Sequence, residues 1–180
     1  MIDSVIWKEK LKQGVNTLQK KLDKRRWSSR AVVLFERELM LMFFSVRALI
    51  EAGKLTLTDR ISYKEYKFLT YPNKGEIVDD ITKYDIDELF DLSAGAERNL
   101  SLKILTHQFV HAYIIDTEFS PQGNVIGVLL CSGWKKDNFL VRVPIRVIIE
   151  ILQEVISDEI TSAHLKRSTK TGELRKVKIL

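Results

Sequence analysis

The stretch from Tyr113 to Val143, YIIDTEFSPQGNVIGVLLCSGWKKDNFLVRV, alternates between runs of β-forming residues and groups of turn residues. The β-forming runs are residues 113–119, 125–131 and 139–143. Pro121–Gly123 and Ser132–Asp137 are typical turn sequences. Strands with such short connections usually pair with their neighbours along the chain. The stretch therefore predicts an antiparallel β-meander.

A helix and a hairpin are expected after this meander. Pro144 suits the first turn of a helix, and the residues through about Ile156 place apolar side chains at the spacing of one buried face. We expect this helix to cover the sheet. Residues 160–166 and 174–180 flank the turn sequence TKTG at 169–172, which predicts a terminal hairpin.

Before the meander, the N-terminal part predicts two helices that form an antiparallel hairpin. Residues 4–25 carry apolar side chains among lysines at helical spacing. Ser28 or Ser29 suits the N-cap of a longer helix to about Ala52, and Gly53 suits its end. This helix is the most apolar part of the chain, but it contains Glu36, Arg37, Glu38, Arg47 and Glu51. Because these charges would be costly in lipid, we interpret it as a core helix and not as a membrane span.

The segment between these helices and the meander is mixed. RISYKEYKFLTY at residues 60–71 predicts a strand or hairpin arm before the turn at 72–75, residues 80–91 suggest a short acidic helix, and residues 99–113 suggest another helix. We expect one α+β domain over residues 1–180, helical over about 4–113 and mainly β over about 113–180. In this fold an N-terminal helical layer packs on the antiparallel meander. Residues 113–143 and 158–180 should form most of the sheet.

Composition narrows the class of protein. The chain is 45% hydrophobic and 29% charged, which is typical of a folded globular protein. Its single cysteine, Cys131, excludes an intrachain disulfide and is expected to be an inert thiol in an apolar strand. The start, MIDSVIWKEKLKQ, has neither an apolar signal core nor a cleavage site, so we expect a cytoplasmic protein without a membrane partner.

Charge is distributed unevenly along the chain. Between Lys8 and Arg30 there are nine Lys or Arg residues against two acids, and between Lys166 and Lys178 six against one, whereas Glu76 to Glu97 holds eight acids. Candidate nucleic-acid contacts are Lys20, Lys21, Lys24, Arg25, Arg26, Lys166, Arg167, Lys170, Arg175, Lys176 and Lys178. Such basic ends fit RNA, another polyanion or an acidic protein. Solubility alone would also explain them.

The candidate site is NLSLKILTHQFVHAY, residues 99–113, which contains two of the three histidines. On a helix, His107 and His111 fall within about a quarter turn of Leu100 and Ile104. A separate apolar face is formed by Leu102, Leu105, Phe109 and Ala112. A helix apolar on two sides is mostly buried, so we expect both imidazoles at a semi-enclosed surface.

Part of this segment, LTHQFVHAY, resembles the last catalytic helix of HEPN-type proteins, a helical family with many bacterial toxin and defence-linked RNases. The family motif is an arginine separated by four to six residues from a histidine, often followed by a small residue and a tyrosine. His111, Ala112 and Tyr113 match its end. The positions of the arginine hold Thr106, Leu105 and Ile104. The resemblance implies a related helical region that has lost the group expected to bind the phosphate.

RNA cleavage needs a base, an acid and a cation, and imidazole can serve as any of them. His107 and His111 are the candidate pair, Tyr113 is carried over from the motif, and Arg47 is the best substitute for the missing cation. The alternative is that Arg47 pairs with Glu36 or Glu51 and that both histidines have only structural partners.

Two histidines one turn apart also suggest zinc. However, Gln108 stands where a metalloprotease would have glutamate, and a third ligand would have to be His164, Asp116 or Glu118. We therefore expect no metal and no cofactor. Trp134, beside Lys135 and Lys136, suits either stacking on a base or folding back over its own sheet.

Together these features favour a degenerate HEPN-like bacterial module that binds RNA or a protein, in a toxin–antitoxin or phage-defence setting suggested by family analogy alone. A metal-independent endoribonuclease that uses His111, His107 and Arg47 is the alternative enzyme. A non-catalytic interaction subunit is the third hypothesis. Assembly into a homo-oligomer is left open.

Overall fold

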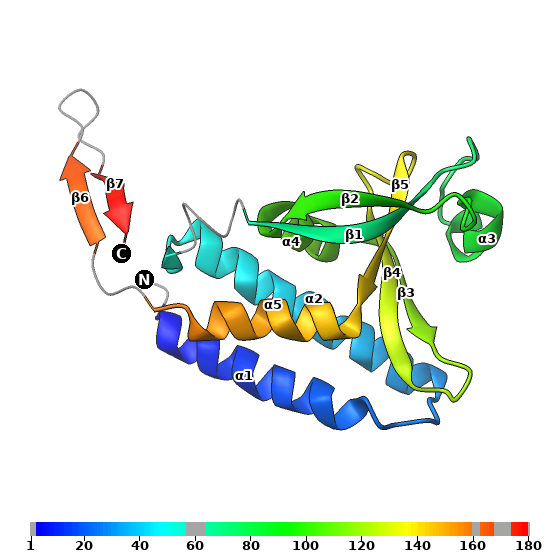
Figure 1. Cartoon of the computed structure of the whole chain (residues 1–180), viewed down its shortest axis with the longest axis horizontal. Helices are drawn as coiled ribbons and strands as arrows, with labels where there is room; N and C mark the ends of the chain where they lie inside the picture. Colours follow the sequence, from blue (N-terminus) through cyan, green and yellow to red (C-terminus); the bar gives the residue numbers. More distant parts are fainter. Residues whose placement is uncertain (1–2, 57–63, 160–162, 168–173, 180) are drawn as a thin grey trace.

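A five-stranded antiparallel sheet in the order β2-β1-β5-β4-β3 is the centre of the computed structural model (Figure 1). The structure describes residues 3–56, 64–159, 163–167 and 174–179. The strands are β1 (Glu65–Pro72), β2 (Ala96–Ser101), β3 (Ala112–Phe119), β4 (Val125–Ser132) and β5 (Phe139–Pro144). With helices packed on this sheet, the α+β class is confirmed.

The predicted meander is present as β3, β4 and β5. Leu130 lies opposite Ile115 of β3 on one side and opposite Val141 of β5 on the other. The first turn contains Gly123 at φ 85, a left-handed conformation that glycine adopts without strain. Local alternation and turn chemistry therefore specify this part of the sheet.

The rest of the sheet differs from the expectation. β1 pairs with both β2 and β5, so the prediction of a strand is confirmed from residue 65 onward, while residues 60–63 lie outside the described residues. The terminal hairpin, β6 (Ala163–Arg167) and β7 (Leu174–Ile179), forms a separate two-stranded sheet. The prediction that residues 158–180 complete the main sheet was therefore wrong. β1 takes that place because Phe68 and Tyr71 bury side chains on opposite faces of the sheet.

Two hydrophobic cores cover the two faces. Val128 and Leu130 of β4 belong to the larger core, which they share with the helices. Leu129 and Cys131 of the same strand belong to a smaller core with Val78, Leu89 and Phe90. This alternation explains why residues 125–131 are almost continuously apolar, because the strand is buried on both sides.

The larger core is closed by α1 (Ser4–Lys21), α2 (Ser29–Glu51) and α5 (Ile145–Ser157). The bounds of α2 agree with the prediction, since the Ser28 side chain caps its first turn and Gly53 follows it at φ 58. α1 ends at Lys21, four residues earlier than expected, and contacts both α2 and α5. Within the described residues, no helix combines the length and apolar character needed to cross a membrane.

The histidine helix is shorter than predicted. α4 spans Leu102–Val110, with the Ser101 side chain accepting a hydrogen bond from the Ile104 N–H. Residues 99–101 belong instead to β2, where Leu100 lies opposite Tyr66 and is buried. At the other end, His111 is the C-cap, and β3 begins at Ala112. Pairing with β1 and β4 thus overrides local helical preference at both ends.

The acidic segment forms two short pieces rather than one helix. A 3-10 turn, η2 (Thr82–Tyr84), precedes α3 (Ile86–Leu89), and both lie on the sheet face opposite α2 and α5 (Figure 1). The Asp79 carboxylate accepts from the backbone N–H groups of Ile81 and Thr82. Such local capping holds a segment that is too short to be a stable helix by itself.

Candidate functional site

α4 is attached to the rest of the fold through its buried side. The Phe109 ring stacks on Phe43 of α2, with ring centroids 3.8 Å apart and planes 2° from parallel. The buried Gln108 side chain accepts a hydrogen bond of 2.7 Å from the Ser132 N–H of β4. These contacts leave Lys103, His107 and His111 on the outer side of the helix.

Arg47 of α2 and His111 meet at this surface. The Arg47 Nη1 atom lies 2.7 Å from His111 Nε2. Arginine has no acceptor, so the guanidinium donates and Nε2 accepts, which places the ring proton of a neutral His111 on Nδ1. Glu51, one turn further along α2, accepts from Arg47 Nε at 2.7 Å and so orients the guanidinium. The structure thus brings together residues that lie far apart in the sequence.

His107 completes the cluster. Its ring centroid lies 4.5 Å from that of His111, and the exposed Trp134 meets it edge-on at 5.9 Å. Partial burial, the neighbouring His111 and the Arg47 charge lower the pKa of His107 below its usual 6.5. His107 is therefore a neutral imidazole near pH 7. We call Arg47, His107, His111 and Trp134 the histidine site.

The acidic neighbours proposed for Arg47 separate into two places. Glu51 forms an ion pair with Arg47, which agrees with the alternative that Arg47 pairs with one of these two glutamates. Glu36 instead accepts a hydrogen bond of 2.9 Å from the Thr117 hydroxyl of β3. Partial burial raises the pKa of Glu36, and the hydroxyl of Thr117 opposes that rise. The glutamates are four turns apart on α2, so they cannot serve the same arginine.

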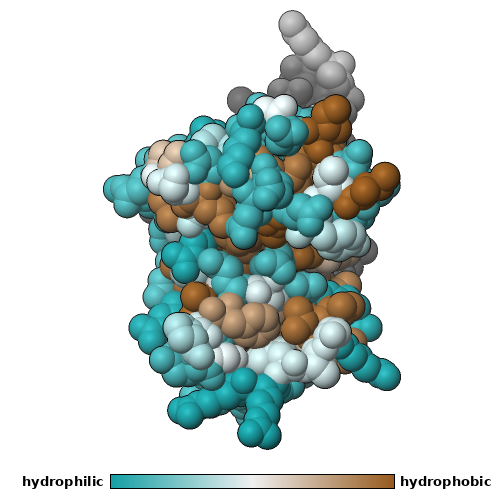
Figure 2. Space-filling view, turned by 90° about the vertical axis from the view of Figure 1, so that its right-hand side faces the viewer, coloured by the Kyte–Doolittle hydropathy of each residue, from teal (hydrophilic) through white to brown (hydrophobic). Residues whose placement is uncertain are grey.

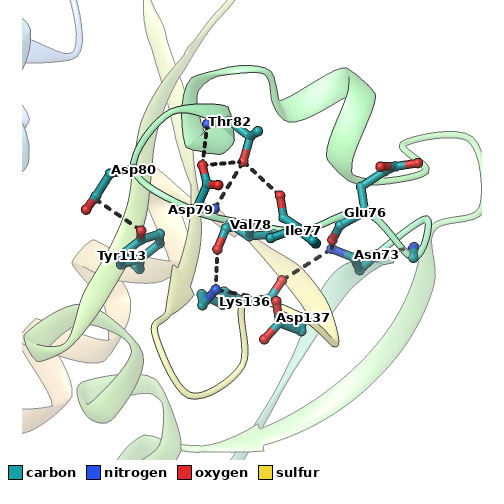
Figure 3. A network of polar contacts seen from close by, with 11 residues as sticks. Asn73, Glu76, Ile77, Val78, Asp79, Asp80, Thr82, Tyr113, Lys136 and Asp137 are labelled. Atoms are coloured by element: carbon teal, nitrogen blue, oxygen red, sulfur yellow. Dashed lines mark hydrogen bonds and ion pairs between the residues drawn. The ribbon is translucent and has the colours of Figure 1, made fainter.

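Tyr113 belongs to a different cluster from the histidines. Its hydroxyl donates to the Asp80 carboxylate at 3.1 Å (Figure 3). The Lys83 and Lys136 ammonium groups lie 5.2 Å and 5.4 Å from its ring centroid. This cluster lies beside η2 and the loop between β4 and β5. The structure therefore does not bring Tyr113 together with His107 and His111 in the way that the sequence predicted. The reason is that the chain becomes a strand at Ala112, which changes the direction of the following side chains.

Figure 3 shows what this second cluster does. Lys136 donates to the Val78 carbonyl, and the Asn73 side-chain amide donates to the Glu76 and Lys136 carbonyls. The Thr82 hydroxyl donates to the Ile77 carbonyl. The bonds between Lys136 and Val78 and between Asn73 and Lys136 connect the 73–82 segment to the β4–β5 loop, and the other two hold the segment itself, so the cluster has a structural role.

The two basic ends lie apart. Lys20 is in the last turn of α1, and Lys24, Arg25 and Arg26 follow it as exposed residues of the α1–α2 connection. Lys21 pairs with Glu38. β6 and β7, which carry Lys166, Arg167, Arg175 and Lys176, lie near the beginning of α1 instead (Figure 1). The side chains of those hairpin residues lie outside the described part, but the backbone places the two basic segments at opposite ends of α1.

The zinc hypothesis has little support in the described residues. No group of three His, Cys, Asp or Glu side chains suited to a metal ion gathers in that part of the chain. Glu118 accepts from Arg142 Nε at 2.8 Å, and Gln108 is engaged with β4. The side chain of His164 lies outside the described residues.

Burial raises the pKa of the Cys131 thiol to about 12, which agrees with an inert core thiol.

Sequence reasoning missed an acidic cleft of about 740 Å³ between the first half of α2, β3 and the η2–α3 segment. Its lining includes Glu36, Asp85, Asp87, Glu88 and Asp116 together with apolar residues. The side of the molecule shown in Figure 2 exposes apolar surface among hydrophilic side chains. The run of acidic residues at 76–97 was the sequence signal for this cleft. The wall that α2 contributes could not be predicted, because it depends on a tertiary contact. The histidine site lies outside the cleft, on open surface.

Comparisons with protein families, curated proteins and solved structures found no match to this chain. The histidine site is therefore interpreted through its chemistry.

Proposed function

We propose that the chain binds RNA at the histidine site, with Arg47 holding a phosphate. The observation that carries this proposal is the 2.7 Å contact between Arg47 Nη1 and His111 Nε2 at an accessible surface. In the part of the chain that the structure describes, the guanidinium bonds to Glu51 and His111, and an arginine with further N–H groups available there suits a phosphate. Trp134, 83% exposed beside His107, offers an apolar ring on which an unpaired base can stack.

The charges around the histidine site favour a polyanion as its ligand over a cation. Lys103 and Lys135 are exposed on the two segments that carry the histidines and Trp134. Glu51 engages the Nε side of Arg47, so it orients the guanidinium and leaves the far side for a ligand. Single-stranded RNA fits better than a duplex, since the bases must be unstacked to reach a tryptophan.

Cleavage is the second candidate function, and the 4.5 Å separation of the two imidazole rings favours it. A neutral imidazole can take the proton from a 2′-hydroxyl, and Arg47 can stabilise the charge on the phosphate. The leaving oxygen, however, needs a proton donor. The lowered pKa of His107 makes its ring a poor proton donor near pH 7, and His111 Nε2 is already engaged by the Arg47 guanidinium. Binding without turnover is therefore the proposed function, and any cleavage should increase below pH 6.5.

Titration of a labelled single-stranded RNA in EDTA tests both functions. We expect Arg47→Gln and Trp134→Ala each to weaken binding roughly tenfold, as the loss of one charged contact or one stacked base predicts. Tyr113→Phe is the matched control, because its hydroxyl bonds to Asp80 outside the site. The proposal fails if Arg47→Gln binds as tightly as the wild type. RNA cleavage in EDTA that is lost in His111→Ala would make the chain an RNase instead.

A further inference from the structure

α2 has a second apolar face that no described residue covers. Its inner face is buried, but Val33, Leu41 and Phe44 on the outer side are 61%, 58% and 52% exposed. Isolated exposed apolar residues are common, whereas a row of them along one helix indicates a contact surface. Arg37, in the same row, is exposed and has no ion-pair partner among the described residues.

The spacing of this outer face is that of a coiled-coil seam. Val33, Arg37, Met40, Phe44 and Glu51 follow one another at intervals of four, three, four and seven residues. Alternation of three and four places side chains on the stripe that faces a partner helix. We call these five residues the α2 seam.

The charges of the α2 seam indicate which partner helix fits it and in which direction that helix runs. Arg37 and Glu51 are each seven residues from Phe44. If a second α2 packs antiparallel with the two-fold axis at Phe44, each Arg37 lies opposite the partner copy's residue 51, a glutamate. A parallel pair would instead place arginine opposite arginine and glutamate opposite glutamate. The seam is therefore complementary to itself in one direction only.

From this pattern we infer that the chain forms a two-fold dimer in which the outer faces of two α2 helices pack antiparallel about Phe44. Glu51 can receive Arg37 of the other copy while it bonds to Arg47, because its side chain is 62% exposed. α2 has 23 residues, about 34 Å of helix. A seam of this length gives an interface near the small end of specific ones, so we expect a dissociation constant on the order of micromolar.

Formation of this dimer does not depend on what the histidine site binds. Arg47 occupies the position between Phe44 and Glu51 in the same three-four spacing and lies at the edge of the seam, and a two-fold axis perpendicular to both helices keeps equivalent residues on the same side of the pair. The dimer would therefore present its two histidine sites on one face. Its existence can be measured without any ligand.

Sedimentation velocity over about 1 to 100 µM protein tests the dimer. We expect the wild type to move from monomer to dimer across this range and Phe44→Glu to remain a monomer at every concentration. Phe44 is half-exposed, so circular dichroism should show that this variant is folded. A wild type that stays monomeric throughout would overturn the inference.

A charge exchange tests the register. Arg37→Glu and Glu51→Arg should each lose the dimer, since each puts like charges opposite one another. An equimolar mixture of the two variants should recover it, because both contacts in the mixed dimer are then between opposite charges. Arg146→Glu and Glu150→Arg, exposed residues of α5, are the matched controls and should dimerise like the wild type. A dimer that persists in Arg37→Glu, or a mixture that stays monomeric, would contradict the antiparallel seam.

Discussion

At the scale of single residues, the histidine site depends on one long-range contact. Arg47 supplies the charge that the LTHQFVHAY segment lacks, and His111 receives its hydrogen bond. Nearby, His107 is affected in two ways: partial burial removes water, and the neighbouring His111 and the Arg47 cation oppose a positive charge on the ring. Both effects favour the neutral ring.

The titration of His107 is a direct test of this arrangement. NMR should give His107 a midpoint below 6.5, and Arg47→Gln should move it upward because one of the opposing charges is removed. In the unfolded chain, His107 takes up a proton near pH 6.5, whereas in the folded protein the ring does so only at lower pH. Because the folded site favours the neutral ring, acid lowers the stability of the fold. This group's contribution to stability is therefore complete above 6.5 and is lost as the pH falls towards the folded midpoint. A midpoint at or above 6.5 would contradict the described packing around His107.

At the scale of secondary-structure elements, the turn between β3 and β4 supports the connection between α1 and α2. Asn124 donates to the Leu22 carbonyl at 2.8 Å. A Cβ on Gly123 would lie 2.3 Å from the Arg25 carbonyl oxygen, which is part of the backbone and cannot rotate away. The β3–β4 turn thus holds the basic α1–α2 connection against the sheet.

Gly123→Ala should consequently destabilise the fold by more than backbone strain alone. We expect a loss of about 2 to 3 kcal/mol in urea unfolding, from the strained positive φ together with the steric clash. Gly75→Ala is the matched control, because Gly75 has a similar φ of 91 but nothing within 4 Å of its Cβ position. That change should cost only about 1 kcal/mol. Equal losses in the two variants would mean that the Arg25 contact is not made in solution.

At the scale of the whole molecule, the basic ends and the histidine site are separate surfaces. α2 runs from Ser29 to Glu51, so the exposed group of Lys20, Lys24, Arg25 and Arg26 lies near its first turn and Arg47 near its last. About 27 Å of helix separates them. A ligand contacts both only if it is long enough to follow α2.

The salt dependence of RNA binding should therefore depend on RNA length. For an oligonucleotide of about 16 residues, glutamine at Lys20, Lys24, Arg25 and Arg26 should reduce the log–log salt slope by about 2 to 3 units, since each neutralised phosphate contributes about −0.7. For an oligonucleotide of about 4 nucleotides, the same variant should bind the RNA as tightly as the wild type does. Lys21→Gln should change neither slope greatly, because Lys21 already pairs with Glu38. A short RNA that responds to the quadruple variant would place its binding site at the basic connection instead.

Local patterns were sufficient for those elements that are stabilised by their own neighbours in sequence. The caps of α2, the turns of the meander and the alternating burial of β4 all depend on residues within a few positions of one another. For that reason the α+β class, the core helix and the terminal hairpin could be predicted. The histidines could also be selected as candidates, because imidazole chemistry is a property of the residue type.

Tertiary structure decided whatever depends on partners distant in the sequence. Residues 99–101 have helical character, yet they are a strand because β1 supplies their hydrogen bonds and buries Leu100. The same pairing places β1 beside β5 and leaves the terminal hairpin as a sheet of its own. Arg47 reaches His111 only because Phe43 stacks on Phe109, and Tyr113 leaves the site because β3 begins at Ala112. Sequence determined which groups were available, and packing between distant segments determined which of them meet, because a long-range contact is stabilised by burial that no local pattern contains.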